Sequence, residues 1–152
     1  MKIQNKRFVY LISPTKIPNN IFFKTLELVL KSKKVSFFQL RLKNEKLSKK
    51  IRISKKIIKI CRKYNVKFLV NDDPILALKV NADGCHLGQK DMSIIKAREI
   101  IGNKIIGVTC HNSIKLAKVA IKYKVDYLAF GAFHKSKTKK IKYIWLWSGG
   151  KR

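Results

Sequence analysis

Residues 71–91 read NDDPILALKVNADGCHLGQKD, and this stretch decides the fold. The segment VKFLVN at residues 66–71 is rich in β-branched and aromatic side chains, which is typical of a buried strand. Pro74 suits the first turn of a short helix, and Asp73 suits its N-cap. The segment DGCHL at residues 83–87 has the pattern of a second short strand. The stretch therefore predicts a strand–helix–strand unit of the kind that builds a parallel sheet.

The same alternation runs along the rest of the chain. We expect the other four strands at residues 7–13, 36–42, 104–109 and 126–132. We expect the other four helices at residues 21–34, 48–64, 93–102 and 113–124. Runs such as KFLV and DYLAF are almost continuously apolar, which favours a sheet that is covered on both faces. The chain has no Gly/Ser-rich linker, so the pattern predicts one α/β domain with about six parallel strands and surrounding helices.

The net charge of the chain is extreme. Its 152 residues include 36 Lys and Arg but only 8 Asp and Glu, which gives a formal charge of +28. A hydrophobic content of 46% excludes a disordered chain. The basic residues are spread along the sequence, without zinc-finger spacing or an aromatic RNA-binding motif. Two interpretations stay open: a basic protein with non-specific affinity for nucleic acid, or lysines that only solvate the surface.

Cysteine usage and hydropathy indicate the compartment. The three cysteines are odd in number and far apart, which argues against a disulfide framework and a zinc site. No apolar run reaches the roughly 18 residues of a membrane-spanning helix. The first residues also make a poor signal peptide. We therefore expect a cytoplasmic protein with no membrane partner.

Half of the acidic residues lie in the stretch 71–91, as Asp72, Asp73, Asp83 and Asp91. Ligand sites of parallel α/β proteins lie at the carboxyl ends of the strands, and Asp72 and Asp91 follow consecutive predicted strands. Mg²⁺ takes one or two carboxylates together with phosphate oxygens and water. We therefore predict that Asp72 and Asp91 hold Mg²⁺, and that Asp73 and Asp83 have turn or capping roles.

The segment QLRLK at residues 39–43 supplies positive charge for the same region. Strand alternation predicts that Gln39, Arg41 and Lys43 point to one side. Donors of this kind, facing a pair of carboxylates, are typical of a site for magnesium and a polyphosphate. A half-exposed strand with one solvated face is the alternative interpretation.

Six motifs together resemble the thiamine phosphate synthase family, which is grouped with the TenI-type thiazole tautomerases. They lie within residues 8–140 and read QLRLK, VNDD, ADGCHLGQKD, GVTCH, DYLAFGAF and TKK. The family fold is a TIM barrel, which has eight β/α units. The resemblance therefore implies an incomplete TIM (β/α) barrel over residues 1–142, truncated at its C-terminal side. The aromatic and basic tail at residues 143–152 does not resemble the family.

The resemblance implies an Mg²⁺-dependent transferase that couples hydroxymethylpyrimidine diphosphate to a thiazole phosphate and releases pyrophosphate. It assigns the pyrimidine diphosphate to Gln39, Arg41, Lys43, Asn71 and Thr109. It assigns magnesium to Asp72 and Asp91, and the thiazole phosphate to Ser136 and Thr138. Lys139 would hold the diphosphate, so Lys139 and Thr109 are the predicted catalytic residues. The cations would stabilise the leaving pyrophosphate while the thiazole nitrogen attacks.

Alternatives and departures accompany this hypothesis. A TenI-like tautomerase is the second candidate, since His111 at a strand end could move a proton, although a structural role would also explain this histidine. The chain has Leu42 where the family usually has an acid and Ala132 where it commonly has proline. Six strands leave the first and last strands as edges, so we expect an open barrel that forms a homo-oligomer, binds a completing subunit, or has low stability.

Overall fold

Strands and helices alternate throughout the computed structural model, which describes residues 8–17 and 19–131. The strands are β1 Val9–Ile12, β2 Val35–Leu40, β3 Lys67–Asn71, β4 Gly84–Leu87, β5 Ile105–His111 and β6 Tyr127–Phe130. The helices are α1 Ile21–Lys31, α2 Leu47–Lys63, α3 Pro74–Lys79, α4 Ile94–Ile101 and α5 Ile114–Lys122. The predicted α/β class and the order of its elements are therefore confirmed.

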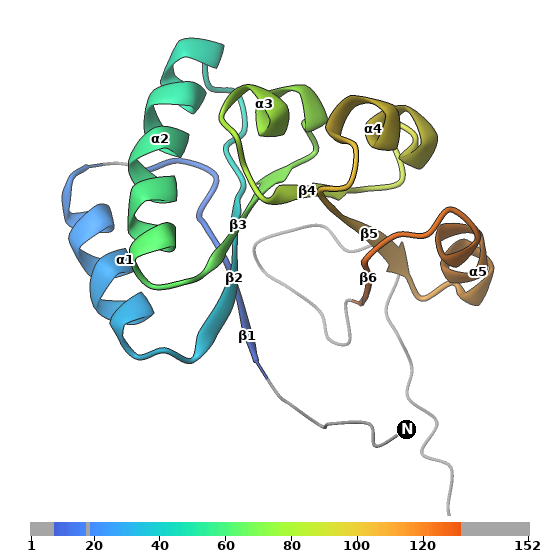
Figure 1. Ribbon diagram of the computed structural model, residues 1–152, viewed down its shortest axis with the longest axis horizontal. Coiled ribbons are helices and arrows are strands. Elements are labelled where there is room, and N and C mark those ends of the chain that lie inside the picture. The colour runs from blue at the N-terminus through green and yellow to red at the C-terminus, as the bar shows by residue number, and fades with distance from the viewer. Residues whose placement is uncertain (1–7, 18, 132–152) are drawn as a thin grey trace, which may run out of the picture.

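The six strands form one parallel sheet in the order β1-β2-β3-β4-β5-β6. The helices lie along one side of this curved sheet, and β1 and β6 are its edges in the part of the chain that the structure describes (Figure 1). A flat sheet of six strands would separate its edges by about 24 Å. The hydroxyl oxygens of Tyr10 in β1 and Tyr127 in β6 are nevertheless 2.6 Å apart. The sheet is therefore curved as in an open barrel, as expected.

The core fills the space between the convex face of the sheet and the helices. Phe38 and Phe68 stack with ring centroids 6.3 Å apart, and both side chains are almost fully buried. Leu30 of α1 and Ile57 of α2 are completely buried in the same cluster. Side chains alternate along a strand, so the neighbours of a core residue in its strand face the concave side. Gln39, which follows Phe38 in β2, is such a neighbour. The core thus orients the polar side chains of the opposite face.

Two of the acidic residues stabilise local structure, as the sequence indicates. Asp73 caps α3, because its carboxylate accepts a hydrogen bond of 2.8 Å from the backbone N–H of Leu76. Asp83 accepts a hydrogen bond of 2.9 Å from the N–H of Phe68 and pairs with Lys67 at 3.1 Å. Both acids therefore have structural roles, as predicted.

Some boundaries differ from the prediction. Strand β2 ends at Leu40, whereas the apolar pattern predicted a strand to Leu42. Strand β5 continues to His111, two residues beyond the predicted end. No helix among the described residues is long and apolar enough to cross a membrane. The predicted change of sequence character at residue 143 lies outside the described residues.

Gly84 offers a direct test of the sheet packing. A Cβ at this position would lie 1.9 Å from the carbonyl oxygen of Ile105, so Gly84→Ala must push β4 and β5 apart. We expect a loss of about 3 kcal/mol in the free energy of unfolding, measured by urea denaturation. Gly102→Ala is the control, because its φ of 57° is strained for alanine but nothing lies within 4 Å of the added Cβ. Its φ of 57° and ψ of −127° form a backbone conformation that is almost restricted to glycine, so that variant should lose about 1–2 kcal/mol from backbone strain alone. A smaller loss for Gly84→Ala than for Gly102→Ala would contradict the packing.

Candidate active site

Two carboxylates meet at the carboxyl edge of the sheet. Asp72 directly follows β3, and its backbone N–H donates to the carbonyl oxygen of His86 in β4 at 2.8 Å. Asp91 lies in the turn after β4, where its Oδ2 accepts a hydrogen bond of 2.7 Å from the N–H of Gly88. This bond orients Asp91, and its carboxyl group reaches that of Asp72.

The approach of these two groups changes the acidity of Asp72. Burial, followed by the hydrogen bond and the charge of Asp91, raises the pKa of Asp72 to about 6. The charge of Lys43 acts in the opposite direction and lowers this pKa. Asp72 also has a φ of 64°, a left-handed conformation that is uncommon outside glycine. Aspartate tolerates this backbone better than most residues, so burial and the neighbouring charge are what disfavour an ionised carboxylate here, which is typical of functional positions.

The two carboxylates fit a magnesium ion. Mg²⁺ usually binds one or two carboxylates and completes its octahedron with water and phosphate oxygens. No group of three or more His, Cys, Asp and Glu residues that could form a full cage occurs within residues 8–17 and 19–131. Burial and the neighbouring Asp91 raise the pKa of Asp72, and a bound cation would offset both the buried charge and the repulsion. The donor set thus suits a metal that shares its coordination with a substrate.

Arg41 and Lys43 lie in the loop after β2, not within a strand. The alternation argument that placed them on one strand face was therefore wrong, because the strand ends at Leu40. Backbone hydrogen bonds fix this loop instead. The N–H of Arg41 donates to Oγ of Ser13 at 2.8 Å, and the N–H of Lys43 donates to the carbonyl oxygen of Thr15 at 3.1 Å. The segment after β1 thus positions both cations, and Lys43 is close enough to Asp72 to affect its pKa.

Gln39 and Asn71 belong to a hydrogen-bonded network on the concave face. Nε2 of Gln39 donates to Oδ1 of Asn71, and Oε1 of Gln39 accepts a hydrogen bond of 3.0 Å from the hydroxyl of Tyr10. Tyr10 in turn contacts the hydroxyl of Tyr127 at 2.6 Å. Gln39 is only 3% exposed, so its amide is held in a single orientation.

The network continues through His86 to Thr109. Nδ1 of His86 lies 2.8 Å from the hydroxyl of Tyr127, and Nε2 lies 2.8 Å from Oγ1 of Thr109. Burial lowers the pKa of His86 to about 4, so the ring is neutral near pH 7. The side chain of Gln89 donates to the carbonyl oxygen of Thr109. The structure thus connects three predicted substrate residues, Gln39, Asn71 and Thr109.

Sequence reasoning missed Tyr10, His86 and Tyr127. Each looks like an ordinary strand residue, because the sequence does not show which strands approach across the concave face. The available signal was His86, a polar side chain in a four-residue strand that is otherwise small or apolar. Cys110, beside His111, is fully buried and is therefore not available as a nucleophile. The predicted residues Ser136, Thr138 and Lys139 lie outside the described residues.

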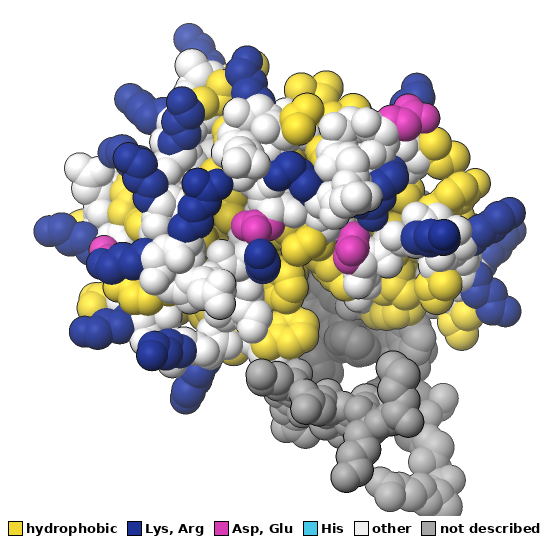
Figure 2. All heavy atoms as spheres, viewed as in Figure 1, with side chains coloured by type: hydrophobic (Ala, Val, Ile, Leu, Met, Phe, Trp, Pro, Cys, Tyr) yellow, Lys and Arg dark blue, Asp and Glu magenta, His cyan; other side chains and the backbone are white. Residues whose placement is uncertain are grey.

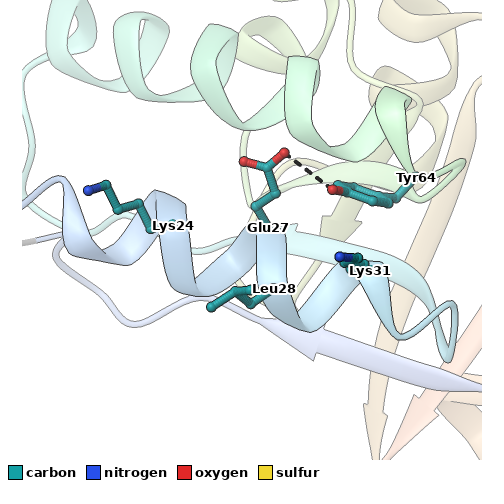
Figure 3. A pocket seen from close by; sticks show the side chains of 5 residues that line it. All are labelled: Lys24, Glu27, Leu28, Lys31 and Tyr64. Atoms are coloured by element: carbon teal, nitrogen blue, oxygen red, sulfur yellow. Dashed lines mark hydrogen bonds between the residues drawn. The ribbon is translucent and has the colours of Figure 1, made fainter.

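The outer surface differs from this region. Lysines and arginines dominate the face shown in Figure 2, where acidic side chains are few. Figure 3 shows a surface hollow lined by Lys24, Glu27, Leu28, Lys31 and Tyr64. These residues come from α1 and the C-cap of α2, and Tyr64 donates a hydrogen bond of 3.2 Å to Glu27. The hollow does not include the strand ends, so it is separate from the candidate site.

A curved parallel sheet covered by helices, with acids, cations and amides at its carboxyl edge, defines the class of α/β-barrel-type proteins, whose ligand sites lie at that edge. The family model for thiamine monophosphate synthase matches residues 9–150, and the chain belongs to this family.

Individual relatives agree with the family. The chain is 69% identical over 139 residues to a thiamine-phosphate synthase of Pelagibacter ubique, covering 91% of this chain and 67% of the relative. It is 42% identical over 138 residues to a thiamine-phosphate synthase of Saccharophagus degradans, covering 89% and 63%. The solved structure of thiamine phosphate pyrophosphorylase from Pyrococcus furiosus matches with a TM-score of 0.75 and 31% identity, covering 84% and 61%. The chain thus spans about two thirds of the length of these proteins.

The raised pKa of Asp72 leads to a prediction about stability. The folded-state pKa of about 6 exceeds the ordinary value of 3.8, so the folded state binds this proton more tightly than the unfolded state. Stability is therefore lost as pH rises through this interval. Asp72→Asn removes the charge and suits a positive φ. We expect it to raise the free energy of unfolding at pH 7.5 by about 1 kcal/mol, after discounting for solvent screening.

The gain should shrink as the pH falls below about 6 and disappear below about pH 3, where the Asp72 carboxyl group is protonated in both states. Urea denaturation of the variant and the parent at several pH values measures this difference in the free energy of unfolding. Asp73→Asn is the matched control, because asparagine also caps helices, and it should change stability by less than about 0.5 kcal/mol. An Asp72→Asn variant that is less stable than the parent at pH 7.5 would contradict the assignment.

Proposed function

We propose that this chain catalyses thiamine phosphate synthesis, joining hydroxymethylpyrimidine diphosphate to a thiazole phosphate with release of pyrophosphate. Family membership and the names of its relatives support the reaction. The observation that supports it most strongly is the contact of Asp72 and Asp91 beside Lys43 at the strand ends. A thiazole tautomerase has no evident need for this combination of acids and cation, so the synthase is favoured.

Asp72 and Asp91 would hold Mg²⁺, which when bound neutralises phosphate charge. Arg41 and Lys43 would bind the phosphate oxygens of the diphosphate through charge-assisted hydrogen bonds. Gln39 and Asn71, whose amides are fixed by each other, would orient the pyrimidine ring. The thiazole nitrogen then attacks the pyrimidine methylene carbon, and the carbon–oxygen bond to the diphosphate breaks.

The second substrate is assigned to residues outside those that the structure describes. Ser136 and Thr138 would receive the thiazole phosphate, and Lys139 would stabilise the leaving diphosphate together with Thr109. We also propose a cytoplasmic location, which the three free, buried cysteines support. Association with a second copy or a completing subunit remains part of the proposal, because β1 and β6 are edge strands. Non-specific contact with nucleic acid follows only from charge.

Magnesium dependence is the first test of this function. The purified chain, incubated with both substrates and Mg²⁺, should form thiamine phosphate and pyrophosphate, detected by chromatography. Chelation with EDTA should stop the reaction, and added Mg²⁺ should restore it. Asp91→Asn should raise the Mg²⁺ concentration that gives half-maximal rate, because one of two carboxylate ligands is lost. Product formation that is unaffected by chelation would refute the metal assignment, and no product under any condition would refute the function.

Arg41 provides a test of the diphosphate site. Arg41→Ala should lower kcat/KM by about 10- to 100-fold, since a hydrogen bond between charged groups contributes about 1.5–3 kcal/mol. The control is Arg52→Ala, at an exposed position of helix α2, which should stay within about twofold of the parent. Arg98 is unsuitable as a control, although it lies on a helix, because it pairs with Asp126 and donates to Lys104. Equal effects at Arg41 and Arg52 would indicate general charge attraction and no defined site.

A further inference from the structure

The turn after β4 carries Asp91, and a side chain in this turn connects it to the next strand. The turn comprises residues 88–91, and Nε2 of Gln89 donates a hydrogen bond to the carbonyl oxygen of Thr109 in β5. We propose that Gln89 is a positioning residue that fixes the metal carboxylate of Asp91 relative to the diphosphate residue Thr109. The proposal rests on the proposed function, which assigns those two roles.

Within the turn, the carboxylate of Asp91 is bound to the backbone of Gly88. Its Oδ2 accepts a hydrogen bond of 2.7 Å from the N–H of Gly88, and the N–H of Asp91 lies 3.4 Å from the carbonyl oxygen of Gly88. A Cβ on Gly88 would lie 2.7 Å from the same Oδ2, so this contact favours glycine. The carboxylate therefore moves with the turn, and its place in the site depends on what holds the turn.

The backbone pairing of β4 with β5 ends before this turn. The last residue of β4, Leu87, pairs with Val108, so Thr109 lies one residue beyond the paired segment. The amide of Gln89 bonds the carbonyl oxygen of Thr109, as a backbone N–H would if the strand continued. Gln89 has an exposed side chain, so this hydrogen bond, and not burial, is what the residue contributes.

A corresponding link made by the backbone joins β3 to β4. The N–H of Asp72 donates to the carbonyl oxygen of His86 at 2.8 Å, which places this first carboxylate against β4. His86 in turn contacts Oγ1 of Thr109 at 2.8 Å through Nε2. Thr109 is therefore held at its hydroxyl by β4 and at its carbonyl oxygen by the turn. Of these links, the one from Gln89 connects Thr109 to the turn that carries the second carboxylate.

The position of the turn matters because a metal shared with a substrate has to meet both. Mg²⁺ demands near-ideal octahedral geometry with ligands at about 2.0–2.1 Å. A small shift of the turn against β5 would therefore separate Asp91 from phosphate oxygens that lie near Thr109. Without the bond from Gln89, Arg41 and Lys43 should still bind a diphosphate, whereas the affinity that Mg²⁺ adds should fall.

Solvent exchange of the Gly88 N–H, measured by NMR, tests the positioning without a ligand, because this hydrogen is bonded to Asp91. Gln89→Met and Gln89→Glu have side chains of similar length that cannot donate to a carbonyl oxygen at neutral pH. Each should speed the exchange at least about fivefold, which corresponds to the loss of one ordinary hydrogen bond. An unchanged exchange rate in both variants would overturn the proposal.

Two controls separate this effect from a general loss of stability. The N–H of Phe68 donates to Asp83 at the amino edge of the sheet, so its exchange should not respond to Gln89→Met. Lys90→Met changes the next exposed position of the same turn and should leave the Gly88 exchange within about twofold of the parent. Equal acceleration of both N–H groups in the Gln89 variants would indicate a purely structural role and would overturn the proposal.

Calorimetry with inorganic pyrophosphate tests the consequence for binding, after correction for the complex of Mg²⁺ with pyrophosphate in solution. In the parent, Mg²⁺ should raise the affinity at least about tenfold over that in EDTA. In Gln89→Met, the affinity in EDTA should stay within about twofold of the parent, and the gain from Mg²⁺ should fall below about threefold. Lys90→Met removes a positive charge, so it should lower the affinity with and without Mg²⁺ alike.

A gain from Mg²⁺ in Gln89→Met equal to that of the parent would overturn the link between Gln89 and the metal site. If the parent fails to bind pyrophosphate, or binds it with no gain from Mg²⁺, the proposed function falls. The exchange rates of the Gly88 N–H still decide in that case whether Gln89 positions Asp91.

Discussion

The contact between the hydroxyls of Tyr10 and Tyr127 is the interaction on which the concave face depends. It joins β1 and β6, the edge strands of the described sheet, through side chains at a distance that only a strongly curved sheet permits. Gly107 in β5 makes room for it, since a Cβ there would lie 1.9 Å from Cζ of Tyr127. Without this curvature, Gln39 and Thr109 would lie in separate parts of a flat sheet. The curvature therefore brings distant strands into a single polar site.

The acidic residues of this chain divide into those that form surface ion pairs and those that lie in the candidate site. Four of the acids pair with single cations: Glu27 with Lys63, Glu45 with Lys49, Asp83 with Lys67 and Asp126 with Arg98. Such surface pairs contribute little to stability, and they are an ordinary use of a carboxylate. Asp72 and Asp91 instead approach each other, and burial together with the neighbouring Asp91 raises the pKa of Asp72. In a chain of net charge +28, two neighbouring carboxylates are unusual, and this contrast is why the pair is the candidate for cation binding.

Local sequence patterns predicted the strands, helices and the helix cap. They did not predict the contacts that depend on the curvature of the sheet. Periodicity identified every strand and helix of the described region, and capping rules assigned Asp73 correctly. The pairing of Asp72 with Asp91 followed from the rule that parallel strands end at one edge. The positions of Arg41 and Lys43 did not follow, because the end of a strand is poorly defined by its own residues. The links among Tyr10, His86 and Tyr127 are non-local contacts across the concave face, which no local pattern encodes.

Within the described residues the sheet has two open edges, so the order of the candidate site must come from contacts other than strand pairing between them. Val9 and Ile12 of β1 and Phe130 of β6 have exposed side chains, and backbone pairing does not join these two strands in the described region. The chain of side-chain hydrogen bonds joins them instead, through Tyr10 and Tyr127. Because Gln39 and His86 attach to the two ends of that contact, the polar face is held from both edges. The orientation of the candidate pyrimidine site thus depends on side-chain bonding among β1 to β6 and does not require strand pairing between the edges.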